Sequence, residues 1–436
     1  MSSSIPGMAA LCIVVMTSLA GCGGGSNSSS SGGGGGGQSP TTVTYTFTGA
    51  APTAVASRVG SGAYAAATLQ SSKLTLSIPN GTTEYAVAFA CPNTSLGIVN
   101  FSSNEEFVVQ RSILDGTSFT EFCTNPTPLQ VGLASAQVNA SAIPDTSFVG
   151  ITAAGFTTPL PWLGSTLTVS SPMVTGTSDV FVVAYDSTGL YPLAVRVLRA
   201  QTIPGALNGG NPVVLTANDE TTKQTITFDN LPSGESPIEV PQVTFYTSGG
   251  QYLQLQTGTP ALPATQYPAM PAGAVQNGDY YTFFSSATAG PAGGAVGFES
   301  ATSEGGPQTI TYPSPWTYSG PSAAALPTFN FSYTGFSGPQ PVVETATIQW
   351  ILGATLANPI GTSFNSIQVS ATQNYQNGAT TLTIPDLSGL AGFIPSPPSG
   401  AALDWDAGIA QGTGFQTTPP NGTVQTVVNA GSFTVP

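Results

Sequence analysis

The chain contains no histidine and only six basic residues among its 436 residues. Histidine is the usual general base near neutral pH and a common ligand of zinc. Its absence excludes Ser-His-Asp and Cys-His catalysis and histidine-ligated zinc sites. We therefore expect no catalytic residue, no cofactor and no metal site. An enzyme made from this sequence would have to use carboxylates, tyrosine, lysine or a hydroxyl nucleophile.

The basic residues are also too scattered to bind a polyanion. Twenty acidic residues oppose them, and the net charge is −14. The basic positions are Arg58, Lys73, Arg111, Arg196, Arg199 and Lys223. Nucleic acids are bound by clusters of Lys and Arg on one face, so no nucleic-acid partner is expected. Charged residues make up 6% of the chain, against about 25% in ordinary soluble domains. A surface made of uncharged polar groups suits a protein outside the cytoplasm.

Long helical patterns are missing, since 52 glycines and 37 prolines interrupt the chain. Short segments that alternate apolar and polar residues, or that are rich in β-branched and aromatic residues, take their place. The clearest are residues 43–47, 73–78, 85–89, 179–185, 193–198, 224–228 and 345–350. These segments predict strands, and the fold class is all-β.

A weak internal repeat indicates how the strands are grouped. Gly81, Gly176, Gly278 and Gly378 each stand before a candidate strand, at intervals of 95, 102 and 100 residues. About 100 residues is the size of one β-sandwich domain. The alternative is coincidence, because a glycine turn before a strand is common in all-β chains. The first copy lies in Ile78-Pro-Asn-Gly-Thr-Thr-Glu-Tyr-Ala-Val, which resembles the hairpin of carboxypeptidase-regulatory-like and other prealbumin-like sandwiches.

The repeat and the Pro/Gly clusters predict tandem β-sandwich domains of Ig-like or prealbumin-like type, after a disordered N-terminal tether. The expected parts are a signal peptide over 1–21, a Gly/Ser-rich tether over 22–40, and sandwich domains over 41–128, 129–210, 211–320 and 321–436.

The N-terminal segment carries the most specific motif. Residues 9–20 form an apolar run that is shorter than the roughly 20 residues needed to span a bilayer. It leads into Leu19-Ala20-Gly21-Cys22, which resembles the lipobox of bacterial lipoproteins. The Gly/Ser run after Cys22 is typical of a flexible spacer. The alternative is a chance match within an apolar run.

The lipoprotein resemblance implies cleavage before Cys22 and acylation of that cysteine, palmitate included. Two or more acyl chains hold a soluble domain stably on a membrane. Membrane lipid is thus the first expected partner. Gly23, in place of an Asp after the cysteine, implies an outer-membrane address in a Gram-negative cell. The expected location is the cell envelope, with the body facing the periplasm or the exterior.

Two further cysteines, Cys91 and Cys123, belong to the body of the chain. In an oxidising compartment an even pair predicts a disulfide, which would close a loop of about 30 residues and contribute roughly 3–4 kcal/mol. The alternative is a pair of buried free thiols.

Paired carboxylates are the catalytic arrangement that a chain without histidine can still provide. Glycoside hydrolases use two of them, about 5–10 Å apart. Glu105-Glu106 and Asp219-Glu220 are adjacent, so on strands they would point to opposite faces. Asp404 and Asp406 would share a face if their segment is extended, with Trp405 opposite. A solvated loop or a weak calcium site is the preferred interpretation of that segment.

Aromatic side chains supply the candidate ligand contacts. Tyr312, Trp316 and Tyr318 lie in a proline-stiffened segment, where rings can stack on sugars at small entropic cost. The alternative is that they fill a domain junction.

The sequence predicts a non-enzymatic structural, adhesive or ligand-binding envelope lipoprotein, with an envelope glycan or a surface protein as candidate partner. The alternative function is a carboxylate-dependent glycoside hydrolase.

Overall fold

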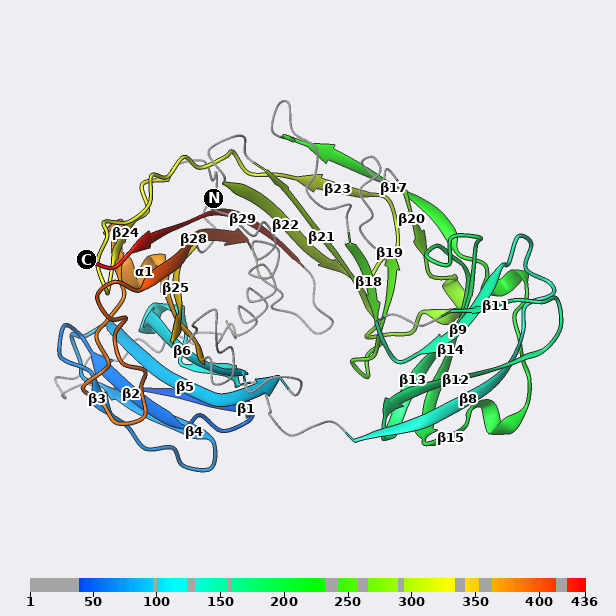
Figure 1. The fold of residues 1–436 in the computed structure, drawn as a ribbon, viewed down its shortest axis with the longest axis horizontal. Coiled ribbons are helices and arrows are strands. Elements are labelled where there is room, and N and C mark those ends of the chain that lie inside the picture. The colour runs from blue at the N-terminus through cyan, green and yellow to red at the C-terminus, as the bar shows by residue number, and fades with distance from the viewer. Residues whose placement is uncertain are drawn as a thin grey trace, which may run out of the picture. The chain divides into compact units, whose positions relative to one another are not determined.

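A computed structural model describes residues 39–96, 101–123, 130–155, 159–231, 242–256, 266–288, 294–333, 342–352, 363–412 and 422–436. It confirms the all-β class: strands dominate the described residues, and their α-helix α1 spans only Gln373–Gln376. Each of the seven segments predicted as strands lies in a strand, namely β1, β4, β5, β13, β14, β17 and β25 (Figure 1). The prediction succeeded because period-two alternation is a local property of the sequence.

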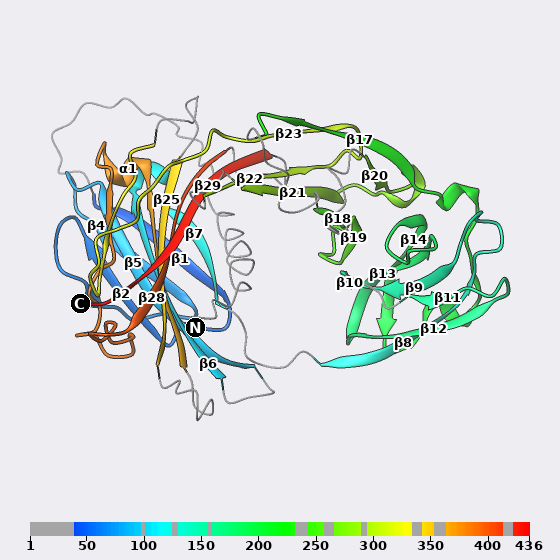
Figure 2. The ribbon, with the colours of Figure 1, turned by 45° about the horizontal axis from the view of Figure 1, so that its top comes forward.

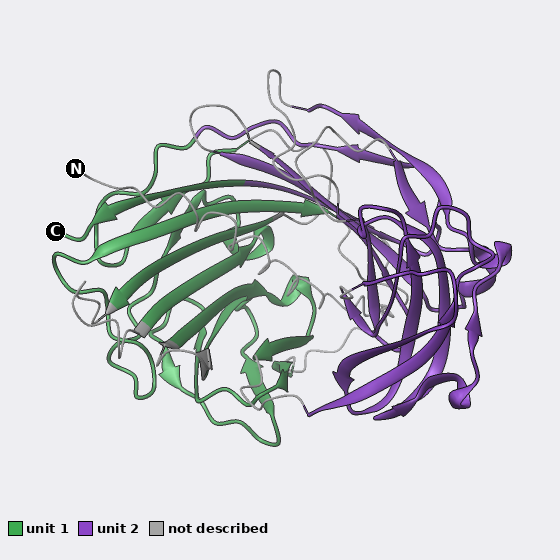
Figure 3. Cartoon of the chain, turned by 45° about the vertical axis from the view of Figure 1, so that its right-hand side comes forward, with its two compact units in different colours: residues 1–126, 318–416, 428–436 green, residues 127–317, 417–427 purple. Residues whose placement is uncertain are grey.

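The chain divides into two compact units, coloured separately in Figure 3. Unit 1 contains residues 1–126, 318–416 and 428–436, and unit 2 contains residues 127–317 and 417–427. The unit limits near 126 and 317 fall close to the domain limits expected at 128 and 320, whereas the limit expected at 210 lies inside unit 2. The division into four sandwich domains stays a prediction.

Unit 1 begins and ends with strands. Its elements are β1 (Thr41–Gly49), β2 (Ala54–Val59), β3 (Ala65–Ala66), β4 (Lys73–Ile78), β5 (Glu84–Leu96), β6 (Phe101–Ser112), η2 (Ile113–Asp115), β7 (Ser118–Cys123), β24 (Thr328–Asn330), β25 (Val342–Leu352), β26 (Ser363–Thr372), α1, β27 (Thr381–Thr383), β28 (Ala402–Gly412) and the second half of β29 (Gly422–Thr434). Its main sheet runs in the order β29-β28-β25-β26-β6-β5-β2-β3.

A three-stranded sheet, β4-β1-β7, packs over part of that main sheet (Figures 1 and 2). The buried face of β4 alternates strictly, with Leu74, Leu76 and Ile78 inside. These side chains meet Tyr85, Phe89 and other residues of β5 in one apolar core. Two sheets that bury their inner faces against each other make the packing of a β-sandwich.

Unit 2 contains two further sheet pairs. Its elements are β8 (Val131–Asn139), β9 (Phe148–Thr152), β10 (Ala154–Gly155), β11 (Leu160–Pro161), β12 (Leu167–Val174), β13 (Gly176–Tyr185), β14 (Pro192–Ile203), β15 (Gly205–Ala206), η3 (Leu207–Gly210), β16 (Val213–Val214), η4 (Ala217–Asp219), β17 (Thr222–Asp229), β18 (Gln242–Tyr246), β19 (Tyr252–Gln256), β20 (Gln266–Ala269), η5 (Ala272–Ala274), β21 (Tyr280–Thr288), β22 (Ala295–Thr302), β23 (Gln308–Thr311) and the first half of β29.

In the first pair, the sheets β11-β9-β13-β14 and β12-β8-β15 enclose a core of small aliphatic side chains. In the second, β20-β17-β23 lies against β10-β19-β18-β21-β22. The ring of Tyr267 on β20 contacts the edges of Tyr281 and Phe283 on β21. This packing buries one face of β18 and β21. The other face of these strands carries the candidate site.

Each of the four repeat glycines has a positive φ, at +85° for Gly81, +124° for Gly176, +92° for Gly278 and +86° for Gly378. They precede or open β5, β13, β21 and β27 in turn. Glycine adopts this backbone conformation without the strain that a Cβ would add. Glycine is therefore suited to all four positions, and the internal repeat of the four segments stays a prediction.

Candidate functional site: a tyrosine ladder in unit 2

Three tyrosines from neighbouring strands of unit 2 stack on one another. Strand β18 lies between β19 and β21 (Figure 1). The strand register places Tyr252 of β19 opposite Tyr246 of β18, and Tyr246 opposite Tyr280 of β21. The ring centroids of Tyr252 and Tyr246 are 5.5 Å apart, and those of Tyr246 and Tyr280 are 4.8 Å apart with an interplanar angle of 3°. We call these three residues the tyrosine ladder.

Strand alternation explains why the ladder is accessible. Phe245 and Tyr281, the neighbours of ladder residues in sequence, point to the buried face, where their rings meet at 5.1 Å. Successive side chains of a strand point to opposite faces. Tyr246 and Tyr280 therefore lie half-buried on the other face, and Tyr252 is 37% exposed.

Mostly polar side chains surround the ladder. The register aligns Thr244 with Gln254 and Thr282, Gln242 with Phe284, and Phe284 with Glu299 of β22. We call this surface the ladder face; it consists of Tyr252, Gln254, Gln242, Thr244, Tyr246, Tyr280, Thr282, Phe284 and Glu299. It contains no Lys and no Arg, and Glu299 is its one carboxylic acid.

Burial raises the pKa of Tyr246, Tyr280 and Glu299 on the ladder face, and Glu299 stays mostly ionised at pH 7. Burial, followed by the neighbouring phenols of Tyr280 and Tyr252, raises the pKa of Tyr246 to about 12. Burial likewise raises the pKa of Glu299 to about 6. The phenol groups of Tyr246 and Tyr280 are neutral hydrogen-bonding groups at neutral pH, because a buried or crowded anion is disfavoured.

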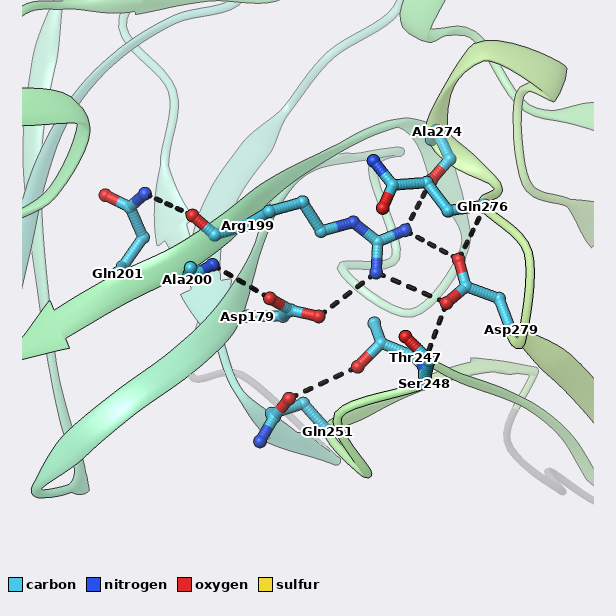
Figure 4. Close-up of polar contacts among 10 residues, drawn as sticks. All are labelled: Asp179, Arg199, Ala200, Gln201, Thr247, Ser248, Gln251, Ala274, Gln276 and Asp279. Atoms are coloured by element: carbon cyan, nitrogen blue, oxygen red, sulfur yellow. Dashed lines mark hydrogen bonds and ion pairs between the residues drawn. The ribbon is translucent and has the colours of Figure 1, made fainter. Parts of the chain in front are cut away.

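An ion cluster around Arg199 fixes the turns next to the ladder (Figure 4). The Arg199 guanidinium donates to Asp279 at 2.6 Å and 3.3 Å, to Asp179 at 3.1 Å and to the carbonyl of Ala274 at 2.8 Å. The Asp279 carboxylate also accepts from the backbone N–H groups of Ser248 and Gln276, each at 2.8 Å.

These contacts join the turn that links β18 to β19 with the turn that precedes β21. Ser248 follows Tyr246 by two residues, and Asp279 directly precedes Tyr280. Gly278 lets the turns approach, because a Cβ there would be 3.0 Å from the Cβ of Ser248. The side chain of Asp279 is fully buried and its oxygens are used by these donors. The Arg199 cluster is thus a structural support that holds the ladder strands in register.

Two of the three aromatic residues that the sequence proposed as ligand contacts are buried, and the third is half-buried. Tyr312 is buried, hydrogen-bonds Ser285 at 2.6 Å and stacks on Phe228. Trp316 is also buried. In unit 1, the half-buried Tyr318 accepts a hydrogen bond from the Asn330 N–H and contacts the ring of Trp405 edge-on at 5.6 Å. Such surroundings favour the packing alternative for these residues.

The predicted disulfide between Cys91 and Cys123 is confirmed, with the two Cα atoms 5.3 Å apart. It links β5 to β7 across the two layers of unit 1. The proposed lipid-attachment residue Cys22, the signal peptide and most of the tether lie outside the described residues. Among the residues that are described, no helix has the length and apolar character needed to cross a membrane.

The Asp404–Asp406 segment is a strand, so the expectation of a solvated loop is wrong. The two carboxylates share one face of β28, and Trp405 points to the other face and is buried. Asp404 is exposed. Burial raises the pKa of Asp406 to about 6, against a hydrogen bond with Thr347 that lowers it. The loop interpretation failed because pairing with β25 on a large sheet overrides weak local strand propensity.

The acidic pairs Glu105-Glu106 and Asp219-Glu220 do not form a common site with Asp404 and Asp406. Glu106 of β6 is buried and accepts a hydrogen bond from the N–H of Ile394. Glu105 points to the face of the sheet opposite to that of Glu106. It lies in the same cross-strand row as Asp404, but three strands away. At the usual strand spacing this separation is roughly 14 Å. Asp219 is paired with Arg196. Within the described ranges, no group of three or more acidic or cysteine side chains could hold a metal ion.

Sequence reasoning missed the tyrosine ladder, although a signal for it exists. Phe245-Tyr246 and Tyr280-Tyr281 are aromatic doublets. On a strand one ring of a doublet must point away from the core. The doublets thus indicate two outward rings, but only the strand register brings them together. No protein-family model matches the chain, and no curated protein sequence matches it either.

Proposed function

We propose that this protein is a lipid-anchored component of the cell envelope whose non-enzymatic β ectodomain binds a ligand through the ladder face. The tyrosine ladder is the observation that carries the binding part of this proposal. Stacked rings on strands whose turns are fixed by the Arg199 cluster lose little conformational entropy when a ligand binds. Phenols, amides and hydroxyls beside the rings supply donors and acceptors in fixed positions.

The membrane part of the proposal is supported by the sequence. The lipobox-like Leu19-Ala20-Gly21-Cys22, the apolar run before it and the Gly/Ser spacer behind it are arranged as in a lipoprotein precursor. Acylated Cys22 would hold the body at the surface of the membrane, with the outer membrane as the address in a Gram-negative cell.

Cys22→Ser in the full-length chain tests the anchor. We expect the wild-type protein to incorporate labelled palmitate and to sediment with membranes, and the variant to do neither. Cys12→Ser is the matched control, because that cysteine lies in the segment predicted to be removed. Membrane association and labelling that survive Cys22→Ser would overturn the anchor.

Adsorption to isolated cell envelopes tests the binding surface. The detergent-solubilised wild-type protein should adsorb, and Tyr246→Ala/Tyr280→Ala should adsorb about tenfold more weakly, because it removes two of the three ladder rings. Phe122→Ala removes an exposed aromatic ring from unit 1 and should have no effect. Equal adsorption of all three proteins would show that the ladder face is not the binding surface.

A second candidate function rests on the shared face of Asp404 and Asp406. Positions two apart on a strand are roughly 7 Å from each other, within the range used by glycoside hydrolases. Their surroundings differ, since Asp404 is exposed while Asp406 has a raised pKa. Release of reducing sugar from a polysaccharide that Asp406→Asn abolishes would favour this enzyme over a binding protein.

A further inference from the structure

From the chemistry of the ladder face we infer that its ligand is an uncharged polysaccharide chain. This inference rests on the proposed binding function and names the class of ligand. It draws on the charges, the hydrogen-bonding groups and the strand pairing of the face.

The charge distribution argues against an anionic ligand. The ladder face has no cationic side chain, and the whole chain carries a net charge of −14. Two of the three cations in unit 2 are already paired, Arg196 with Asp219 and Arg199 with Asp179 and Asp279. The third, Lys223, lies over the ring of Tyr191. A nucleic acid or an acidic polysaccharide would therefore meet repulsion without local compensation.

The hydrogen-bonding groups match the hydroxyl groups of a sugar. Phenol and threonine hydroxyls both donate and accept, and each glutamine amide offers both functions within one side chain. Sugar hydroxyls have the same dual character. Gln254 and Thr244 are neighbours across β19 and β18, and Thr282 follows on β21. A chain lying along this row would meet groups that can both donate and accept hydrogen bonds beside the rings.

The strand pairing argues against an extended peptide. Peptide strands commonly bind by adding to the exposed edge of a sheet through main-chain hydrogen bonds. β18 is paired on one side with β19 and on the other with β21. The backbone groups under the middle of the ladder are therefore occupied, and a ligand can use side chains only.

The ladder also has a direction. Its rings follow one another across three strands at 5.5 Å and 4.8 Å. An extended ligand along the ladder therefore runs across the strands. This arrangement favours a linear polymer, whose successive units can meet successive rings, over a compact small molecule.

Affinity electrophoresis of the full-length protein in detergent tests the inference. The gels contain hydroxyethylcellulose, dextran or galactomannan as uncharged probes, and alginate as an acidic probe. We expect retardation by at least one uncharged polymer, unchanged when the ionic strength is raised, because the contacts are uncharged. Alginate should cause no retardation.

Variants connect the binding to the ladder. Tyr246→Ala should weaken the apparent affinity about tenfold, and Tyr246→Phe, which keeps the ring and loses the hydroxyl, should weaken it less. Phe122→Ala should behave as the wild type. The urea midpoint of each variant shows whether it is folded, and Tyr246→Phe keeps the test valid if the alanine variant is unstable.

The outcomes separate the inference from the proposed function. Salt-sensitive binding to alginate that requires Tyr246 would overturn the uncharged ligand. A lack of binding to every uncharged polymer, with Tyr246-dependent adsorption to envelopes intact, would overturn the glycan class and leave the binding surface in place. Loss of both Tyr246-dependent effects would overturn the proposed function itself.

Discussion

The two units differ in the partners of most of their buried carboxylates, although Glu121 of unit 1 also lies 3.6 Å from a guanidinium group, that of Arg111. In unit 2, Asp279 and Asp219 are paired with Arg199 and Arg196. In unit 1, the oxygens of Glu106 and Asp406 meet neutral donors, the Ile394 N–H and the Thr347 hydroxyl. Burial accordingly raises the pKa of Glu106 to about 7 and that of Asp406 to about 6.

The pKa of Asp179 in unit 2 is shifted in the opposite direction to that of Glu106 and Asp406. Burial acts to raise its pKa, but hydrogen bonds from the Ala200 N–H and the Arg199 side chain bring it below the usual value. Glu299 is an exception within unit 2, with a pKa raised to about 6. A chain with six cations cannot pair every buried acid, and its four arginines are divided equally between the units. Burial outweighs Arg111 even at Glu121, whose pKa is raised to about 7. The remaining acids are accommodated by a shift toward the protonated form.

Arg199→Met should have the largest effect, because it leaves the fully buried carboxylate of Asp279 without its counter-ion. We expect the unfolding free energy of unit 2 to fall by about 3–5 kcal/mol. Urea titration, with hydrogen exchange to locate the loss in unit 2, measures it. Arg199→Lys keeps the charge and loses the double hydrogen bond, so it should be milder. A stability of Arg199→Met equal to wild type would contradict the role of the cluster.

Cys91→Ser/Cys123→Ser tests the corresponding link in unit 1, which is covalent. Loss of a closed loop of this size should lower the unfolding free energy of unit 1 by about 3–4 kcal/mol. Urea titration under non-reducing conditions measures the effect. The reduced wild-type protein should match the variant, and a variant as stable as the oxidised wild type would argue against this account.

The pH dependence should differ between the units. The folded-state pKa of Glu106, about 7, exceeds its unfolded value of about 4.3. Its contribution to stability is therefore complete below the unfolded pKa and is lost as the pH rises through about 7. Unit 1 should be more stable at pH 5 than at pH 8. Asp179 acts oppositely: its contribution is present above about pH 4 and is lost as the pH falls through its lowered pKa.

Glu106→Gln isolates this effect, since the amide oxygen can still accept from the Ile394 N–H. At pH 8 the variant should be more stable than wild type by about 1–3 kcal/mol, and at pH 4 the two should converge. Urea midpoints across this range test it. An unchanged pH profile in the variant would show that Glu106 is not the responsible group.

Gly278→Ala and Gly378→Ala should give the smallest effects and form a matched pair. Both glycines have φ near +90°, so each substitution carries backbone strain of about 1 kcal/mol. Only the Cβ at 278 would press on another residue, Ser248, while nothing lies within 4 Å of the Cβ at 378. Gly278→Ala should therefore lower the urea midpoint more. Equal losses would show that the approach of the two turns is not tight.

The features that could be predicted from the sequence are local ones. Strand β4 coincides with the predicted segment 73–78, because one strand reveals its inward face by alternation. The Cys91–Cys123 bond was predictable because two cysteines in the body of the chain leave one pairing. The shared face of Asp404 and Asp406 followed from the same alternation, once the segment is extended.

The candidate site could not be predicted because it depends on register. Nothing local shows that Tyr246 and Tyr280, 34 positions apart in the chain, face each other across two strands. The sequence did offer the packing of Tyr312 and Trp316 as an alternative to ligand contact, but the strands that cover these rings are distant in sequence. The support from Arg199 needs strand β14 and two turns that are distant from it in sequence.

The discontinuity of unit 1 has a consequence for biosynthesis. Strand β26 pairs with β6, and the hydrogen bond from Asn104 to Asn365 joins positions 261 residues apart. At the usual elongation rate, β6 waits roughly 10–50 s for its partner strand to be made. The aliphatic core of unit 2, between residues 134 and 215, can close during that interval. A chain cut before β26 would leave β6 with an open edge, and an open edge is a template for pairing with other copies.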